Sequence, residues 1–144
     1  MMSKNGRRIS FILGHVLLIG TLILTAPLSA RAVEFETIRS NMKNMTSVAW
    51  DDYSNSLKGQ SVSWSGWISD VKEQWLGGYK ILIDMDPPGS ASVQDVYIED
   101  IDKSVAARFS KDQKVRFSGR IKSVMSVLGS CAVTLENASI NGNY

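Results

Sequence analysis

Residues 59–71 read GQSVSWSGWISDV and residues 112–124 read DQKVRFSGRIKSV, so one pattern occurs twice, 53 positions apart. In both copies hydrophobic and polar residues alternate, and a glycine, Gly66 or Gly119, stands at the same place. Alternation with a period of two is typical of a half-buried β-strand. A glycine inside such a strand is typical of a sharp bend, where a missing Cβ relieves crowding. The repeat therefore predicts two bent strands of one small closed barrel. Duplication of half a gene is an alternative explanation of the repeat, but shared barrel geometry explains it without a duplication.

The segments around the two copies also show clear periodicities. Alternation bounded by glycine- or proline-containing turns predicts further strands at residues 79–86, 95–99 and 131–140. Apolar residues at steps of three and four predict helices within residues 33–58, with a break near residues 44–47, and within residues 101–110. The order is helices, three strands, one helix and two strands, which is the layout of the OB-fold, a five-stranded Greek-key barrel. We expect the barrel to occupy residues 59–144.

The N-terminus has the features of an export signal. Basic residues including Arg7 and Arg8 precede an apolar run at residues 9–24, and a small-x-small site follows at residues 30–32. We expect residues 1–32 to be a signal peptide cleaved after Ala32, and the mature chain to be periplasmic. An uncleaved membrane anchor is the alternative. Arg7 and Arg8 hint at twin-arginine export, but Phe11 comes one position late for that motif, which favours general secretion.

Removing the signal changes which functions the composition allows. Residues 1–32 hold four of the 16 basic residues and none of the 14 acidic ones, so the remainder carries 12 against 14 and a net charge of −2. A basic surface for nucleic acid is therefore not expected. The single histidine, His15, lies in the signal, and Cys131 is the only cysteine. The mature chain therefore lacks the side chains for histidine-based catalysis, for most zinc sites and for an internal disulfide.

Three stretches resemble a known family. Residues 57–68 (LKGQSVSWSGWI), 111–121 (KDQKVRFSGRI) and 133–140 (VTLENASI) are similar to the tRNA-anticodon-like OB-fold family of small exported bacterial proteins. The resemblance covers roughly residues 50–140 and its motifs are mostly structural. It implies an OB-fold outside the cytoplasm, and it carries over no catalytic residue.

Four residues are candidates for ligand binding: Trp75, Trp67, Tyr97 and Arg120. OB-folds bind ligands through the loop between strands one and two, the loop between strands four and five, and the face of strands two and three. Alternation places Trp67, Tyr97 and Arg120 outside the core, and Trp75 near the first of these loops. Aromatic side chains there could stack on bases or sugars, or anchor a protein. Alternatively, Trp67 packs beneath the N-terminal helices.

Three carboxylates near the end of the second strand are the remaining candidate site. Asp84, Asp86 and Asp95 could hold calcium, but their spacing fits no EF-hand, and we expect solvated acids and no metal. The sequence thus predicts a non-enzymatic module without a cofactor, which recognises a cell-envelope protein or peptide. An oligosaccharide or single-stranded nucleic acid is the alternative ligand, and the charge disfavours nucleic acid.

Overall fold

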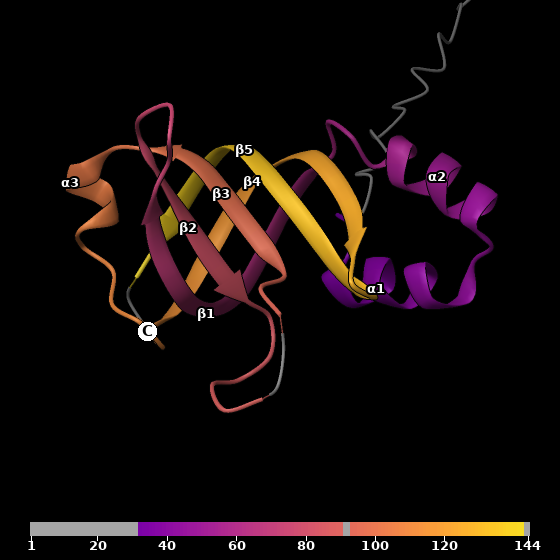
Figure 1. Cartoon of the computed structure of the whole chain (residues 1–144), viewed down its shortest axis with the longest axis horizontal. Coiled ribbons are helices and arrows are strands. Elements are labelled where there is room, and N and C mark those ends of the chain that lie inside the picture. The colour runs from indigo at the N-terminus through magenta and orange to yellow at the C-terminus, as the bar shows by residue number, and fades with distance from the viewer. Residues whose placement is uncertain (1–31, 91–92, 143–144) are drawn as a thin grey trace, which may run out of the picture.

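The computed structural model describes residues 32–90 and 93–142, and the predicted signal lies outside this range except for Ala32. The chain forms a closed five-stranded barrel with two N-terminal helices and one short helix between the third and fourth strands (Figure 1). The predicted fold class is confirmed.

The N-terminal helices are α1 (Phe35–Asn44) and α2 (Ser47–Ser56). The expected break separates them, because Thr46 is the N-cap of α2 and its Oγ1 accepts a hydrogen bond from the Ala49 amide at 3.4 Å. Gly59 then adopts a φ of +81° and turns the chain into the barrel. Across residues 32–90 and 93–142, no helix has both the length and the apolar character needed to cross a membrane.

The remaining elements follow the predicted order. They are β1 (Ser61–Glu73), β2 (Tyr79–Asp84), β3 (Val96–Ile101), α3 (Lys103–Ala106), β4 (Lys114–Val127) and β5 (Ser130–Asn141). Two elements are shorter than expected. The strand β2 ends at Asp84, whose carboxylate accepts a hydrogen bond from the Asp86 amide at 3.1 Å and turns the chain. The helix α3 is a single turn, and its N-cap residue Asp102 makes no side-chain capping bond.

Strand pairing closes the sheet on itself. The order around the barrel is β1-β2-β3-β5-β4, with β4 pairing back to β1. Only β3 and β5 run parallel, through Val96 to Ile98 opposite Val133 to Leu135, and the other neighbours are antiparallel. This closure removes most exposed strand edges, as the OB-fold layout requires.

The two copies of the repeat lie side by side in β1 and β4. Both bend glycines allow another strand to come close, which agrees with a crowded barrel wall. A Cβ added at Gly66 would lie 2.6 Å from Ile83 Cγ2 and 2.7 Å from the Asp84 carbonyl oxygen of β2. At Gly119 the nearest atom would be Ala138 Cβ of β5, at 3.1 Å. The repeat thus marks two places where a neighbouring strand leaves little room for a side chain, and the room is smaller at Gly66 than at Gly119.

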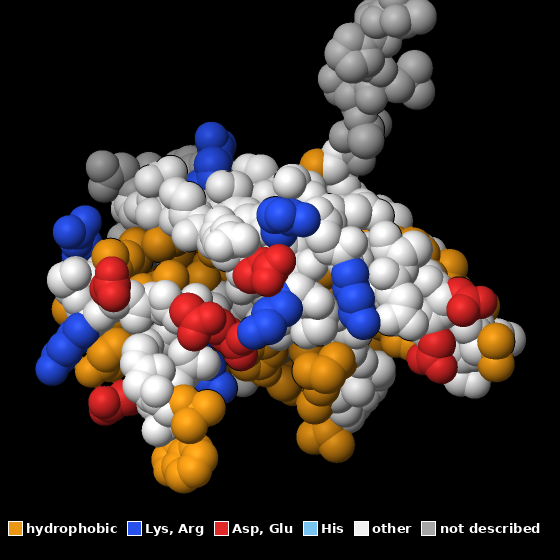
Figure 2. Space-filling model, turned by 90° about the horizontal axis from the view of Figure 1, so that it is seen from above, with side chains coloured by type: hydrophobic (Ala, Val, Ile, Leu, Met, Phe, Trp, Pro, Cys, Tyr) orange, Lys and Arg blue, Asp and Glu red, His pale blue; other side chains and the backbone are white. Residues whose placement is uncertain are grey.

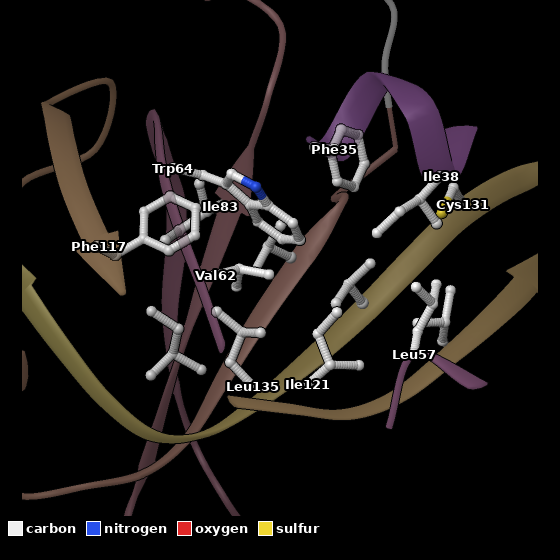
Figure 3. Close-up of a cluster of buried hydrophobic side chains, with 14 of the residues drawn as sticks. Phe35, Ile38, Leu57, Val62, Trp64, Ile83, Phe117, Ile121, Cys131 and Leu135 are labelled. Atoms are coloured by element: carbon white, nitrogen blue, oxygen red, sulfur yellow. The ribbon is translucent and has the colours of Figure 1, made fainter. Parts of the chain in front are cut away.

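The core fills the barrel and extends under α1, which seals one end (Figure 3). Phe35 and Ile38 of α1 are 2% and 0% exposed, and the Phe35 ring packs edge-to-face on Trp64 of β1 at 5.6 Å. The Trp64 indole Nε1 donates a hydrogen bond to the Val33 carbonyl at 2.9 Å. The N-terminal helices are therefore part of the same core as the barrel.

Leu82 of β2 departs from the predicted alternation, because it is buried although it lies on the face expected to be outward.

Candidate binding surface

The β1–β2 loop, residues 74–78, presents two apolar side chains to solvent. Trp75 is 97% exposed and Leu76 is 90% exposed. The loop backbone is closed by two hydrogen bonds, from the Gln74 amide to the Gly78 carbonyl at 2.9 Å and from the Gly77 amide to the Gln74 carbonyl at 3.0 Å. Both glycines have a positive φ, which L side chains rarely adopt. The turn chemistry therefore holds the backbone while the indole projects away from the barrel.

This loop is also fixed to its neighbour β3. Gln74 Oε1 accepts a hydrogen bond from the Asp100 amide at 3.3 Å. A hollow of about 320 Å³ lies beside the indole, and its lining includes the stem of the loop and β2: Glu73, Gln74, Trp75, Leu76 and Lys80. The Lys80 ammonium lies 5.9 Å from the centre of the Tyr97 ring. Lys80 thus links two of the predicted site residues, Trp75 and Tyr97, into one surface.

The other two predicted site residues lie elsewhere. Trp67 of β1 is half-buried, and the Lys114 ammonium of β4 lies 5.2 Å from its ring centre. The tryptophan that packs on α1 is its neighbour Trp64. Arg120 of β4 is exposed, and its Nε donates to the Gly59 carbonyl at 3.3 Å, at the entry to β1. The four candidates therefore do not form a single site.

Charged side chains of both signs are mixed on one face of the molecule. Figure 2 shows Lys and Arg side chains interspersed with Asp and Glu, and hydrophobic side chains projecting at the edge of the view. Among the described residues, Lys122 Nζ and Glu99 Oε2 form an ion pair at 2.8 Å. No continuous basic stripe appears on the face seen in Figure 2.

The three predicted carboxylates do come together, but they are not all solvated. Oxygen atoms of Asp84, Asp86 and Asp95 lie within 4.8 Å of one another. The expectation of solvated acids is wrong for Asp95, which is only 3% exposed. Arg39 of α1 reaches this group, with its Nη2 2.9 Å from Asp95 Oδ2 and 3.2 Å from Asp86 Oδ2. Asp95 Oδ2 also accepts a hydrogen bond from the Met85 amide at 2.9 Å.

This cluster has perturbed protonation equilibria. Burial raises the pKa of Asp95 to about 6, the Met85 hydrogen bond and Arg39 oppose that rise, and Asp84 and Asp86 add to it. Burial lowers the pKa of Arg39, but the Asp86 hydrogen bond and the nearby carboxylates outweigh it, so the Arg39 pKa is raised. Burial also raises the pKa of the neighbouring Cys131 thiol to about 12. The cation in this group is a guanidinium that ties α1 to the barrel, so we interpret the group as structural.

The sequence pattern did not identify Arg39 as part of this group, because its partner Asp95 lies 56 residues later in the chain.

Comparison with known proteins adds no functional assignment, since no family model and no curated protein matches this chain.

Proposed function

We propose that this protein is an exported, non-enzymatic OB-fold module that binds a protein or peptide of the cell envelope through the surface formed by Trp75, Leu76, Lys80 and Tyr97. The observation that carries the proposal is the nearly complete exposure of Trp75 and Leu76 on a hydrogen-bonded loop. Large apolar side chains exposed together are costly unless a partner covers them. Tryptophan is also among the residues that dominate binding energy at protein interfaces.

The export part of the proposal rests on the N-terminal sequence. A basic start, an apolar run at residues 9–24 and a small-x-small site at residues 30–32 together support a periplasmic mature chain that begins at Val33. The resemblance to small exported OB-fold proteins supports the same compartment.

A glycan is the second candidate ligand. The hollow beside Trp75 combines an aromatic face with the carboxylate of Glu73, the amide of Gln74 and the ammonium of Lys80. Hydroxyl groups of a sugar could bond to these polar groups while the ring stacks on the indole. Single-stranded nucleic acid ranks lower, because the net charge of −2 and the interspersed charges provide little counterion release.

The test compares mature chains that begin at Val33. Trp75→Ala should reduce capture of an envelope partner at least about tenfold, which corresponds to about 1.4 kcal/mol. It should leave the melting temperature unchanged, because the indole makes little contact with the fold. Leu128→Ala is the matched control, since Leu128 is 95% exposed on a different loop.

The outcomes separate the candidate ligands. Equal loss of capture in both variants would indicate nonspecific hydrophobic adhesion and contradict the proposed surface. Binding to envelope oligosaccharides that Trp75→Ala abolishes would instead promote the glycan. Tight binding to oligonucleotides that falls steeply with salt would promote nucleic acid.

A further inference from the structure

The predicted cleavage bond, between Ala32 and Val33, lies at the very start of the folded structure. Ala32 is exposed, but Val33 is half-buried and packs against the core. The Val33 carbonyl accepts the hydrogen bond from Trp64 Nε1 at 2.9 Å, and Trp64 is itself 5% exposed. The first residue of the expected mature chain is therefore held by the barrel.

The next two residues are held as well. The Glu34 carbonyl accepts hydrogen bonds from the Thr37 amide at 3.1 Å and the Ile38 amide at 3.3 Å, which form the first turn of α1. Phe35 is 2% exposed. No flexible linker therefore separates the predicted cleavage bond from the core.

Proteases cleave segments that are exposed and able to leave the folded structure, because the substrate must lie extended in the active site on both sides of the bond. In the folded protein, the residues after the Ala32–Val33 bond are tied to Trp64 or coiled into α1. The segment that begins at Val33, which must enter the active site of a peptidase, is thus held in the folded structure.

We propose that signal cleavage of this protein must precede the docking of α1 on the barrel, and that a precursor which folds first is protected from the signal peptidase. Cleavage is hydrolysis: water adds across the Ala32–Val33 amide and leaves a carboxylate on Ala32 and an ammonium on Val33. The proposal rests on the proposed export signal. It fits a secretion route that moves unfolded chains and argues against a route that carries folded ones, despite Arg7 and Arg8.

The experiment uses the full chain in detergent and purified bacterial signal peptidase. Three samples are compared: the folded wild-type precursor, the wild-type chain synthesised with the peptidase already present, and a folded variant with Gly-Ser-Gly-Ser-Gly-Ser inserted between Val33 and Glu34. The insertion preserves the cleavage bond and α1 but moves the bond away from Phe35. Circular dichroism checks that the variant is folded, and N-terminal sequencing identifies the product.

We expect the nascent chain and the linker variant to be cut to a product beginning at Val33, and the folded wild type to be cut at least about tenfold more slowly, because cleavage waits for local opening. Equal rates for the folded wild type and the linker variant would overturn the inference while leaving the export signal intact. If neither the nascent chain nor the linker variant is cleaved, the export signal itself is overturned, and the inference with it. If only the nascent chain is cleaved, the signal stands and the inference is overturned, because a free cleavage bond did not restore cleavage.

Discussion

Trp64 of β1 and Phe117 of β4 lie directly opposite each other, with ring centres 6.3 Å apart and ring planes at 85°. They are equivalent residues of the sequence repeat, so the two antiparallel copies pair symmetrically about these two residues. In the same register, Gly66 faces Val115 and Gly119 faces Val62. The repeat is therefore a local two-fold arrangement inside the barrel, in which each bend glycine is set against a buried valine of the other copy.

The two bend glycines should differ in their tolerance of a side chain. Gly66→Ala should lower the free energy of unfolding by about 2 to 4 kcal/mol, because the new Cβ meets the Asp84 carbonyl of β2 at 2.7 Å and a backbone atom cannot rotate away. Gly119→Ala should cost about 1 kcal/mol, since its closest contacts are 3.1 Å or longer. Urea unfolding of the mature chain measures both. Equal losses would show that bending, and not close approach, explains the glycines.

Local patterns predicted the elements of this fold because alternation and helical spacing report directly on which face of a segment is buried. The order of strands then limited the closed arrangements to very few. The Arg39–Asp95 contact could not be predicted in this way. Arg39 has the pattern of a polar residue of an amphipathic helix, and Asp95 that of an outward-facing residue at the start of a strand. Only closure of the barrel, where the Asp95 amide and carbonyl bond to Ile83 and Val133, buries that carboxylate. The binding role of Trp75 stays a prediction.

Stability should depend on pH through Asp95. Its pKa is raised to about 6 in the folded state, so between pH values of about 4 and 6 the folded chain holds a proton that the unfolded chain has released. The free energy of unfolding should therefore fall as the pH rises through this window, by up to about 3 kcal/mol, and level off above it. Urea unfolding across the window should show this fall in the wild type and a much flatter profile in Asp95→Asn. Greater wild-type stability at neutral pH than at the acidic end, absent from Asp95→Asn, would contradict the assignment.

Removal of the Arg39 guanidinium should destabilise the fold more than removal of the Asp95 charge that it faces. Arg39→Met leaves the buried Asp95 carboxylate without its cation, so we expect a loss of about 3 kcal/mol at neutral pH. The loss should shrink in acid, where Asp95 takes up a proton.

The double variant Arg39→Met with Asp95→Asn supplies the control. It removes both charges and should recover part of the stability that Arg39→Met loses, because no buried charge is left unpaired. A double variant less stable than Arg39→Met alone would contradict this explanation, because it would show that the Asp95 carboxylate stabilises the fold even without the Arg39 guanidinium.

The β4–β5 hairpin offers a route to a more stable protein. Val127 pairs with Ser130, so Leu128 and Gly129 form a two-residue loop, and both have a positive φ, of 50° and 79°. This is the pattern of a type I′ turn, in which asparagine followed by glycine is preferred. Leucine is disfavoured in the left-handed region, because its Cβ crowds the backbone. Its side chain is 95% exposed, so little packing offsets the strain.

Leu128→Asn should therefore raise the free energy of unfolding by about 1 kcal/mol and the melting temperature by about 4 °C. Leu128→Ala removes the same exposed side chain without favouring the left-handed region, so its stability should stay near that of the wild type. A gain in both variants would point to removal of exposed apolar surface, and a loss in Leu128→Asn would show that the leucine makes contacts that stabilise the hairpin.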